Sequence, residues 1–148
     1  MLLERDVIQQ KGFRNLTDEA GNVWGFQVCI RQKVYRGTWL SQFRFGALVV
    51  DGVEYGPDDC TFTVSGIEYK YEEMAPLWRV KFPLNEVMVI KVKKPGGLAQ
   101  GEHTVDIRTG QIRSYLPPRI DASLTAPRDP NGPRDMMGMN NLRKLIIV

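Results

Sequence analysis

Apolar and polar residues alternate along most of the chain, which is typical of β-strands with one buried face. In the clearest run, His103, Val105 and Ile107 share one side and polar residues occupy the other. Residues 23–31 alternate in the same way, with the even-numbered side chains predicted to face the core. In residues 43–49 the odd-numbered side chains form the predicted buried face.

Turn signals separate these runs at short intervals. Asp51-Gly52 between two apolar runs predicts a tight hairpin, because both central residues of a type I′ turn need positive φ. Ser65-Gly66 repeats this pattern, and residues 71–76 predict one helical turn that ends at Pro76. Residues 77–82 and 86–92 predict two more strands. About eight to ten short strands predict an all-β antiparallel sandwich.

A glycine-rich turn, Pro95 to Gly101, joins residues 86–92 to the strand that carries His103. Proline ends the first strand because it fixes φ and donates no hydrogen bond. No helix pattern follows the glycines, so we interpret the loop as a structural turn and not as a phosphate cradle.

The chain changes character at its C-terminal end. Residues 127–135 are proline-rich, and residues 142–148 are apolar and β-prone. We therefore divide the chain into a β-sandwich domain, 1–126, and an extended C-terminal tail or arm, 127–148. Residues 123–126 are a candidate for one short extra strand. The apolar end would aggregate in water, so it is expected to dock on a sheet edge, either of this chain or of a partner.

Charge and composition narrow the class of protein. The net charge is +3, but residues 128–148 hold four cationic and two acidic side chains, which leaves the body nearly neutral. A nucleic-acid surface needs a concentrated basic field, so none is expected. There is no signal-peptide pattern and no apolar run of about 18 residues, so we expect a cytoplasmic protein without a membrane span. Cys29 and Cys60 are expected to be buried free thiols.

The sequence contains no complete catalytic or metal-binding pattern. His103 is the only histidine, and a zinc site usually needs several His or Cys ligands. His103 lies on the apolar face of its strand, so we interpret it as a hydrogen-bonded core or interface residue. No catalytic residue, metal ligand or cofactor is therefore assigned to this chain.

Aromatic and arginine side chains in turns are the best candidates for a functional surface, because interface hot spots are enriched in them. They could equally be core aromatics with solvated arginines, and aromatic faces also suit sugars or flavonoid rings. The candidate interface residues are Tyr35, Arg36, Trp39, Arg113 and Tyr115.

Several motifs, in their order along the chain, resemble those of a known family. They are residues 12–15 (Gly-Phe-Arg-Asn), 25–27 (Gly-Phe-Gln), 35–41 (Tyr-Arg-Gly-Thr-Trp-Leu-Ser), 62–66 (Phe-Thr-Val-Ser-Gly), 94–103 (Lys-Pro-Gly-Gly-Leu-Ala-Gln-Gly-Glu-His) and 113–117 (Arg-Ser-Tyr-Leu-Pro). Over roughly residues 10–126 the chain resembles the small β subunit of bacterial C-glycoside deglycosidases.

This resemblance implies a β-sandwich that pairs with a larger α subunit, a TIM barrel that holds a divalent metal, expected to be manganese, and the catalytic histidine. It implies cleavage of the carbon–carbon bond between a 3-oxo-glucosyl group and a flavonoid-type aglycone by lyase-like elimination. The β subunit would not be active alone, and αβ pairs could assemble further.

Two other functions remain open from the residues themselves. One is a stand-alone carbohydrate-binding sandwich, which would bind sugar unaided. The other is a structural module that self-assembles through its final strand.

Overall fold

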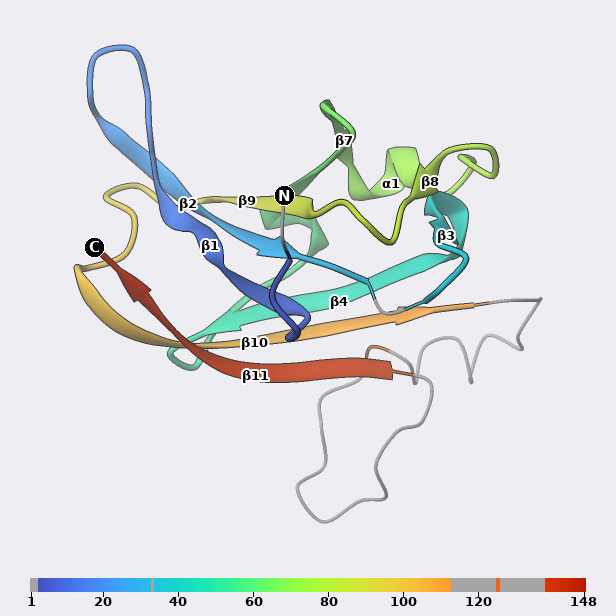
Figure 1. Ribbon diagram of the computed structural model, residues 1–148. Helices are drawn as coiled ribbons and strands as arrows, with labels where there is room; N and C mark the ends of the chain where they lie inside the picture. Colours follow the sequence, from blue (N-terminus) through green and yellow to red (C-terminus); the bar gives the residue numbers. More distant parts are fainter. Residues whose placement is uncertain (1–2, 33, 113–124, 126–137) are drawn as a thin grey trace.

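The computed structural model describes residues 3–32, 34–112, 125 and 138–148. Two antiparallel sheets face each other across one core, as expected for an all-β sandwich (Figure 1). The proline-rich residues 127–135 and the expected boundary after residue 126 lie outside the described residues. No helix in the described part of the chain is long and apolar enough to cross a membrane.

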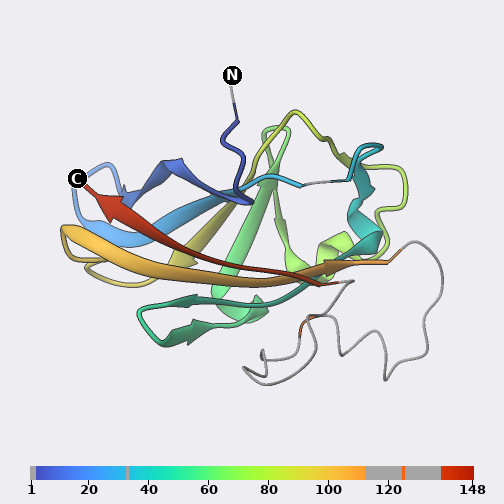
Figure 2. The ribbon, with the colours of Figure 1, turned by 60° about the horizontal axis from the view of Figure 1, so that its bottom comes forward.

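The elements group into two main sheets and a short ribbon. The first sheet has the order β1 (Ile8–Thr17), β2 (Val23–Ile30), β9 (Met88–Lys93), β6 (Cys60–Val64) and β7 (Ile67–Lys70). The second has the order β11 (Gly138–Ile147), β10 (Gly101–Gln111), β4 (Phe43–Val50) and β5 (Val53–Tyr55), which follow one another across it in Figure 2. The ribbon pairs β3 (Thr38–Trp39) with β8 (Lys81–Phe82). Short helical turns are η1 (Leu40–Gln42), η2 (Pro57–Asp59) and α1 (Tyr71–Met74).

An aromatic cluster joins the two sheets. Phe62 on β6 is fully buried, and its ring centroid lies 5.0 Å from that of Phe45 and 6.3 Å from that of Phe43, both on β4. Edge-to-face ring pairs of this kind add to the burial of apolar area. This aromatic cluster therefore holds the two sheets together near the end of the sandwich that carries the β3–β8 ribbon.

The local turn predictions are confirmed. Asp51 and Gly52 have φ of 51° and 82°, and Ser65 and Gly66 have φ of 51° and 81°, as type I′ hairpins require. The helical turn is confirmed as α1.

The alternation predicted for residues 43–49 is wrong in its second half. Phe45 belongs to the core cluster, but after it the core residues are Leu48 and Val50, whereas Ala47 is buried outside that cluster and Val49 is only partly covered. The register against β10 skips Gly46, because Arg108 pairs with Ala47 and Thr109 with Phe45. An irregularity of this kind places the following side chains on the opposite face.

The prediction of a half-buried strand at residues 23–31 is also wrong, because β2 is buried on both faces from Gly25 to Ile30, whereas Trp24, predicted to face the core, is 37% exposed. The register between β1 and β2 shifts between Gln9 and Arg14, and this part of β1 lies over Gln27 and Cys29. The amide of Gln27 donates to the Gly12 carbonyl over 2.9 Å. A Cβ on Gly12, whose φ is +88°, would lie 2.6 Å from the Cys29 sulfur. Only glycine fits there.

The strand predicted for residues 77–82 is reduced to β8. The Leu77 N–H donates to the Met74 carbonyl, and the backbone then runs along η1, where Leu40 N–H donates to the Val80 carbonyl over 2.8 Å. This arrangement brings Trp78 and Arg79 to the same end of the molecule as β3.

The C-terminal strand docks on a sheet edge of this chain. β11 pairs with β10 along its whole length, from Ile147 opposite Gly101 to Gly138 opposite Gly110. The Gln10 side-chain amide donates to the Ile146 carbonyl and accepts from the Ile146 N–H. Arg143 also pairs with the Glu4 carboxylate over 2.8 Å. The N-terminal segment thus covers part of the outer edge of β11.

The loop between β9 and β10 is a tight, internally bonded turn. Gly96 and Gly97 have φ of 83° and 63°. The Asn15 side chain accepts from the Leu98 N–H and donates to the Leu98 carbonyl, each over 2.8 Å. These two hydrogen bonds join the backbone of the loop to β1.

Candidate functional site

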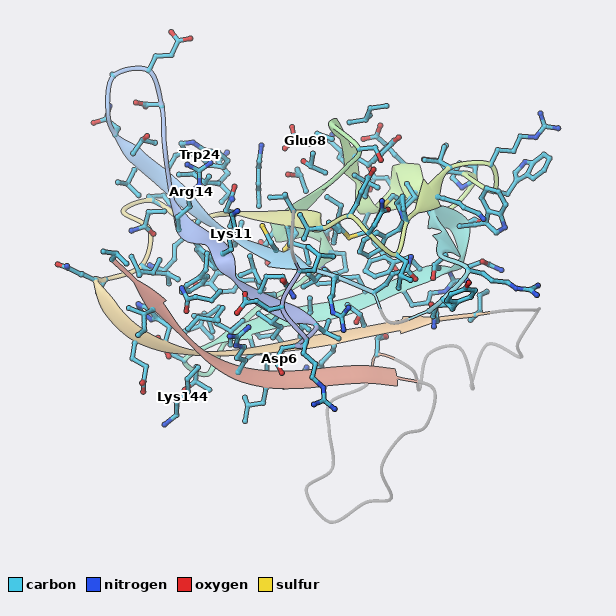
Figure 3. All side chains as sticks on the ribbon, viewed as in Figure 1. Asp6, Lys11, Arg14, Trp24, Glu68 and Lys144 are labelled. Atoms are coloured by element: carbon cyan, nitrogen blue, oxygen red, sulfur yellow. The ribbon has the colours of Figure 1, made fainter. Side chains whose placement is uncertain are left out.

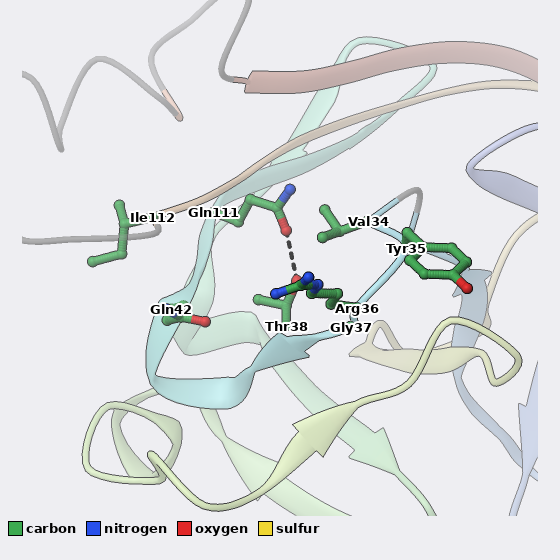
Figure 4. Close-up of a pocket in the computed structure, with 8 residues that line it drawn as sticks. All are labelled: Val34, Tyr35, Arg36, Gly37, Thr38, Gln42, Gln111 and Ile112. Atoms are coloured by element: carbon green, nitrogen blue, oxygen red, sulfur yellow. Dashed lines mark hydrogen bonds between the residues drawn. The ribbon is translucent and has the colours of Figure 1, made fainter.

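A pocket of about 560 Å³ opens at the end of the sandwich where the β3–β8 ribbon meets the end of β10 (Figure 4). The segment before β3 forms one wall and the last described residues of β10 form the other. The pocket is lined by Val34, Tyr35, Arg36, Gly37, Thr38, Gln42, Gln111 and Ile112.

A hydrogen-bond network fixes the floor of this pocket. The Gln32 side-chain N–H donates to the Phe82 carbonyl. This bond orients the amide oxygen of Gln32 toward Thr38. The Thr38 hydroxyl oxygen lies 2.8 Å from that amide oxygen and 2.6 Å from the amide oxygen of Gln111. A hydroxyl has one hydrogen and can donate to only one of them at a time. Thr38 therefore donates to the amide oxygen of either Gln32 or Gln111, on the pocket wall, and leaves the other oxygen without this donor.

The rim of the pocket is aromatic and cationic. Tyr35 is 86% exposed, and the Arg36 side chain beside it is also exposed. On the ribbon, the Lys81 ammonium lies 4.9 Å from the ring centroid of Trp39. Farther along the same segment, the Arg79 guanidinium lies 4.2 Å from the ring centroid of Trp78, which is 61% exposed.

The structure places three of the candidate interface residues at this end. Tyr35 and Arg36 line the pocket, and Trp39 lies on the ribbon next to it, 36% exposed. Tyr35 does not belong to the core. Arg113 and Tyr115 lie outside the described residues. That these residues form an interface stays a prediction.

Sequence reasoning missed Trp78, Arg79 and Lys81, because residues 77–82 are predicted to form a strand. The adjacent Trp78-Arg79 pair, directly after the turn at Pro76, was the available signal. It is the same combination of residue types that selected Arg36 and Trp39.

His103 lies at the opposite end of β10 and is almost fully buried, at 7% exposure. One ring nitrogen lies 2.5 Å from an Asp51 carboxylate oxygen, and the other lies 2.6 Å from the Ala99 carbonyl. Burial alone lowers the pKa of His103, but the bonds to Ala99 and Asp51 outweigh it, so the pKa lies above its usual value of 6.5. Both nitrogens donate when the ring is charged. Its geometry is that of a structural tie between the loop and the β4–β5 hairpin.

The thiols offer no activated nucleophile. Burial, with a smaller effect of the Asp59 carboxylate, raises the pKa of the Cys60 thiol to about 12. Burial also raises the pKa of the Cys29 thiol. Both cysteines are free and buried, as predicted. Within the described ranges, no three His, Cys, Asp or Glu side chains come together as a metal site.

Comparison with known proteins gives one consistent result. Residues 3–115 match a family model described as C-glycoside deglycosidase beta subunit. The C-glycoside deglycosidase beta subunit of Eubacterium cellulosolvens is 38% identical over 147 residues, which cover 99% of this chain and 100% of that protein.

Proposed function

Because this chain belongs to the C-glycoside deglycosidase beta subunit family, we propose that it is the accessory subunit of a C-deglycosidase whose reaction takes place on a larger catalytic α subunit. The full-length similarity to a beta subunit carries this proposal. The partner is a TIM-barrel protein that holds a divalent metal, manganese, together with the catalytic base. The absence of a metal-binding cluster among the described residues is compatible with this division of labour.

The proposed reaction is a lyase-like elimination on a 3-oxo-C-glucoside of the flavonoid type. The 3-keto group acidifies the proton on the neighbouring carbon, and a base of the partner removes it. The electron pair forms a carbon–carbon double bond within the sugar as the bond to the aglycone breaks. The electron-rich aromatic carbon of the aglycone then takes up a proton, so that no oxidant or reductant is consumed.

This chain contributes a surface to the reaction. Tyr35, Arg36 and Trp39, at the open end of the sandwich, are the proposed contacts to the α subunit, together with Arg113 and Tyr115. Arginine and large aromatic side chains supply much of the binding energy at protein interfaces. Docking there would stabilise the barrel and shape the aglycone side of its pocket.

The test is an assay of three preparations with a 3-oxo-C-glucoside and manganese: this chain alone, the protein encoded next to it alone, and the two co-expressed. We expect activity in the co-expressed preparation only, in one co-eluting peak. Full activity of the neighbouring protein without this chain would contradict the proposal, as would a chain that never co-elutes with its neighbour.

The exposed rings of Tyr35, Trp39 and Trp78 beside a pocket favour one alternative, a stand-alone carbohydrate-binding module. This alternative requires that the isolated chain bind a sugar and that Trp39→Ala abolish the binding. Calorimetry with glucose and a C-glucoside distinguishes the two functions, because the subunit proposal expects no binding by the isolated chain.

A further inference from the structure

The segment that sequence reasoning missed points to the chemistry of the partner surface. We propose that the end of the sandwich carrying Arg36, Trp39, Trp78, Arg79 and Lys81, here called the cation–aromatic end, docks against a carboxylate-bearing surface of the partner subunit. This inference rests on the proposed function and specifies which face of the chain is used and what it recognises.

The cation–aromatic end carries positive charge that no carboxylate of the described residues neutralises. On the two sheets, Arg108 pairs with the Glu54 carboxylate over 3.0 Å, and Arg143 pairs with the Glu4 carboxylate over 2.8 Å. At the cation–aromatic end, Arg36, Arg79 and Lys81 have no carboxylate within the 4.0 Å of an ion pair among the described residues. Three neighbouring cations without counter-charges favour an acidic partner.

Two of these cations are already held in place. Arg79 lies over the Trp78 ring, and Lys81 lies over the Trp39 ring while it also donates to the Arg36 carbonyl over 3.3 Å. A cation that rests on an indole face has lost part of its hydration and of its rotamer freedom. Less entropy is then lost when a carboxylate binds it, which makes such pairs suited to an interface.

Exposed aromatic rings are also concentrated at this end of the sandwich. Tyr35, Trp39 and Trp78 are all exposed and lie on the segments around the pocket, whereas Trp24 lies at the far end of β2 (Figure 3). Large aromatic side chains are disfavoured in water unless a partner covers them, and Trp, Tyr and Arg are the residues enriched at interface hot spots. The amide of Gln111 in the adjacent pocket can complete the polar contacts.

The experiment compares charge reversals at two places on the chain. Lys81→Glu and Arg79→Glu alter the cation–aromatic end, and Lys93→Glu makes the same charge change at the opposite end of the sandwich, where Lys93 is exposed at the end of β9. Trp39→Ala is matched by Trp24→Ala, because the two rings are 36% and 37% exposed. Each variant is titrated against the purified catalytic subunit by calorimetry, and its thermal unfolding is recorded.

We expect each change at the cation–aromatic end to weaken binding by about tenfold or more, as for hot-spot residues, and each control to stay within about twofold. The affinity of the wild-type chain should fall as the salt concentration rises, because salt screens exposed charges. For the same reason, the difference in affinity between wild type and Lys81→Glu should become smaller. The neutral variants Lys81→Gln and Arg79→Gln should lie between wild type and the reversals. This gradation separates a charge effect from a folding defect.

The inference is wrong if the wild-type chain binds and activates the partner and the charge-reversal variants bind as well as Lys93→Glu does. That result leaves the proposed function intact. Tighter binding by the reversals would show a basic partner surface and would also overturn the inference. If the wild-type chain neither binds nor activates the catalytic subunit, the proposed function itself falls.

Discussion

Replacing Asp51 with Asn removes one charge from the His103 tie while leaving the backbone turn intact. Asp51 has φ of 51°, a conformation that Asn adopts readily, and its second carboxylate oxygen accepts the Thr104 N–H over 2.8 Å, which an amide oxygen can also do. An Asn side chain can donate to the neutral imidazole through its amide group. The variant therefore keeps the shape and the hydrogen bonds and loses only the ion pair.

The size of the effect follows from burial. A hydrogen bond between charged groups contributes roughly 1.5–3 kcal/mol when desolvated, whereas an exposed ion pair contributes about 0–1 kcal/mol. The His103 side chain is 8% exposed but that of Asp51 is 47% exposed, so the pair lies between these limits. We expect Asp51→Asn to lower the free energy of unfolding by about 1–2 kcal/mol near pH 5.5.

This loss should depend on pH in a defined direction. The pKa of His103 is raised above 6.5, so its contribution is complete below pH 6.5 and is lost as the pH rises through the raised value. The hydrogen bonds from His103 and from the Thr104 N–H hold the pKa of Asp51 below 3.8, so its contribution is present above that pH and is lost as the pH falls through the lowered value. The gap between wild type and variant should be widest between these limits.

Urea unfolding of both proteins at several pH values measures the gap, and proton NMR titration measures the pKa of His103. The sequence holds one histidine, so the imidazole signal needs no assignment. We expect the pKa of His103 to fall in Asp51→Asn, because burial, which lowers this pKa, is unchanged, whereas the Asp51 carboxylate, which raises it, has been removed. If the difference in stability does not change between pH 5 and pH 9, or if the pKa of His103 is unchanged in the variant, then Asp51 and His103 do not form a stabilising ion pair.

Three further predictions test the loop, the thiols and the core. In Gly97→Ala, at a φ of +63°, the new Cβ would lie 2.4 Å from the Asn15 amide oxygen. Gly96 also has a positive φ, but a Cβ there would meet nothing within 4 Å, so Gly97→Ala should destabilise the protein clearly more than Gly96→Ala. Thermal unfolding curves of the two variants measure the difference. Cys60, with its pKa near 12, should resist iodoacetamide at pH 8 until urea unfolds the chain, and labelling followed by mass spectrometry shows this; rapid native labelling would contradict the burial. Phe62→Ala should cost about 3–5 kcal/mol by chemical denaturation, because it empties the aromatic cluster between the sheets; a cost below about 1 kcal/mol would mean that the cluster repacks.

Most of the local elements follow from residue patterns along the chain. Asp51-Gly52 and Ser65-Gly66 specify their hairpins because few residues tolerate the positive φ that a tight turn needs. The alternation around His103 specifies the buried face of β10 because side chains in a strand point alternately to its two sides. Free buried cysteines and the all-β class followed from the same local signals. The interface candidates Tyr35, Arg36 and Trp39 followed from their residue types and their predicted position in a turn.

Features that depend on contacts between distant segments could not be predicted from the sequence. The buried positions of β4 change face because the pairing with β10 skips Gly46. The second face of β2 is buried because β1 shifts its register and covers it. The apolar end could have docked on this chain or on a partner, and pairing with β10 settled it within the described chain. The cation–aromatic end appears only when the segment after α1 lies along β3. Sequence patterns report the two faces of a single element, whereas these features depend on which element lies beside it.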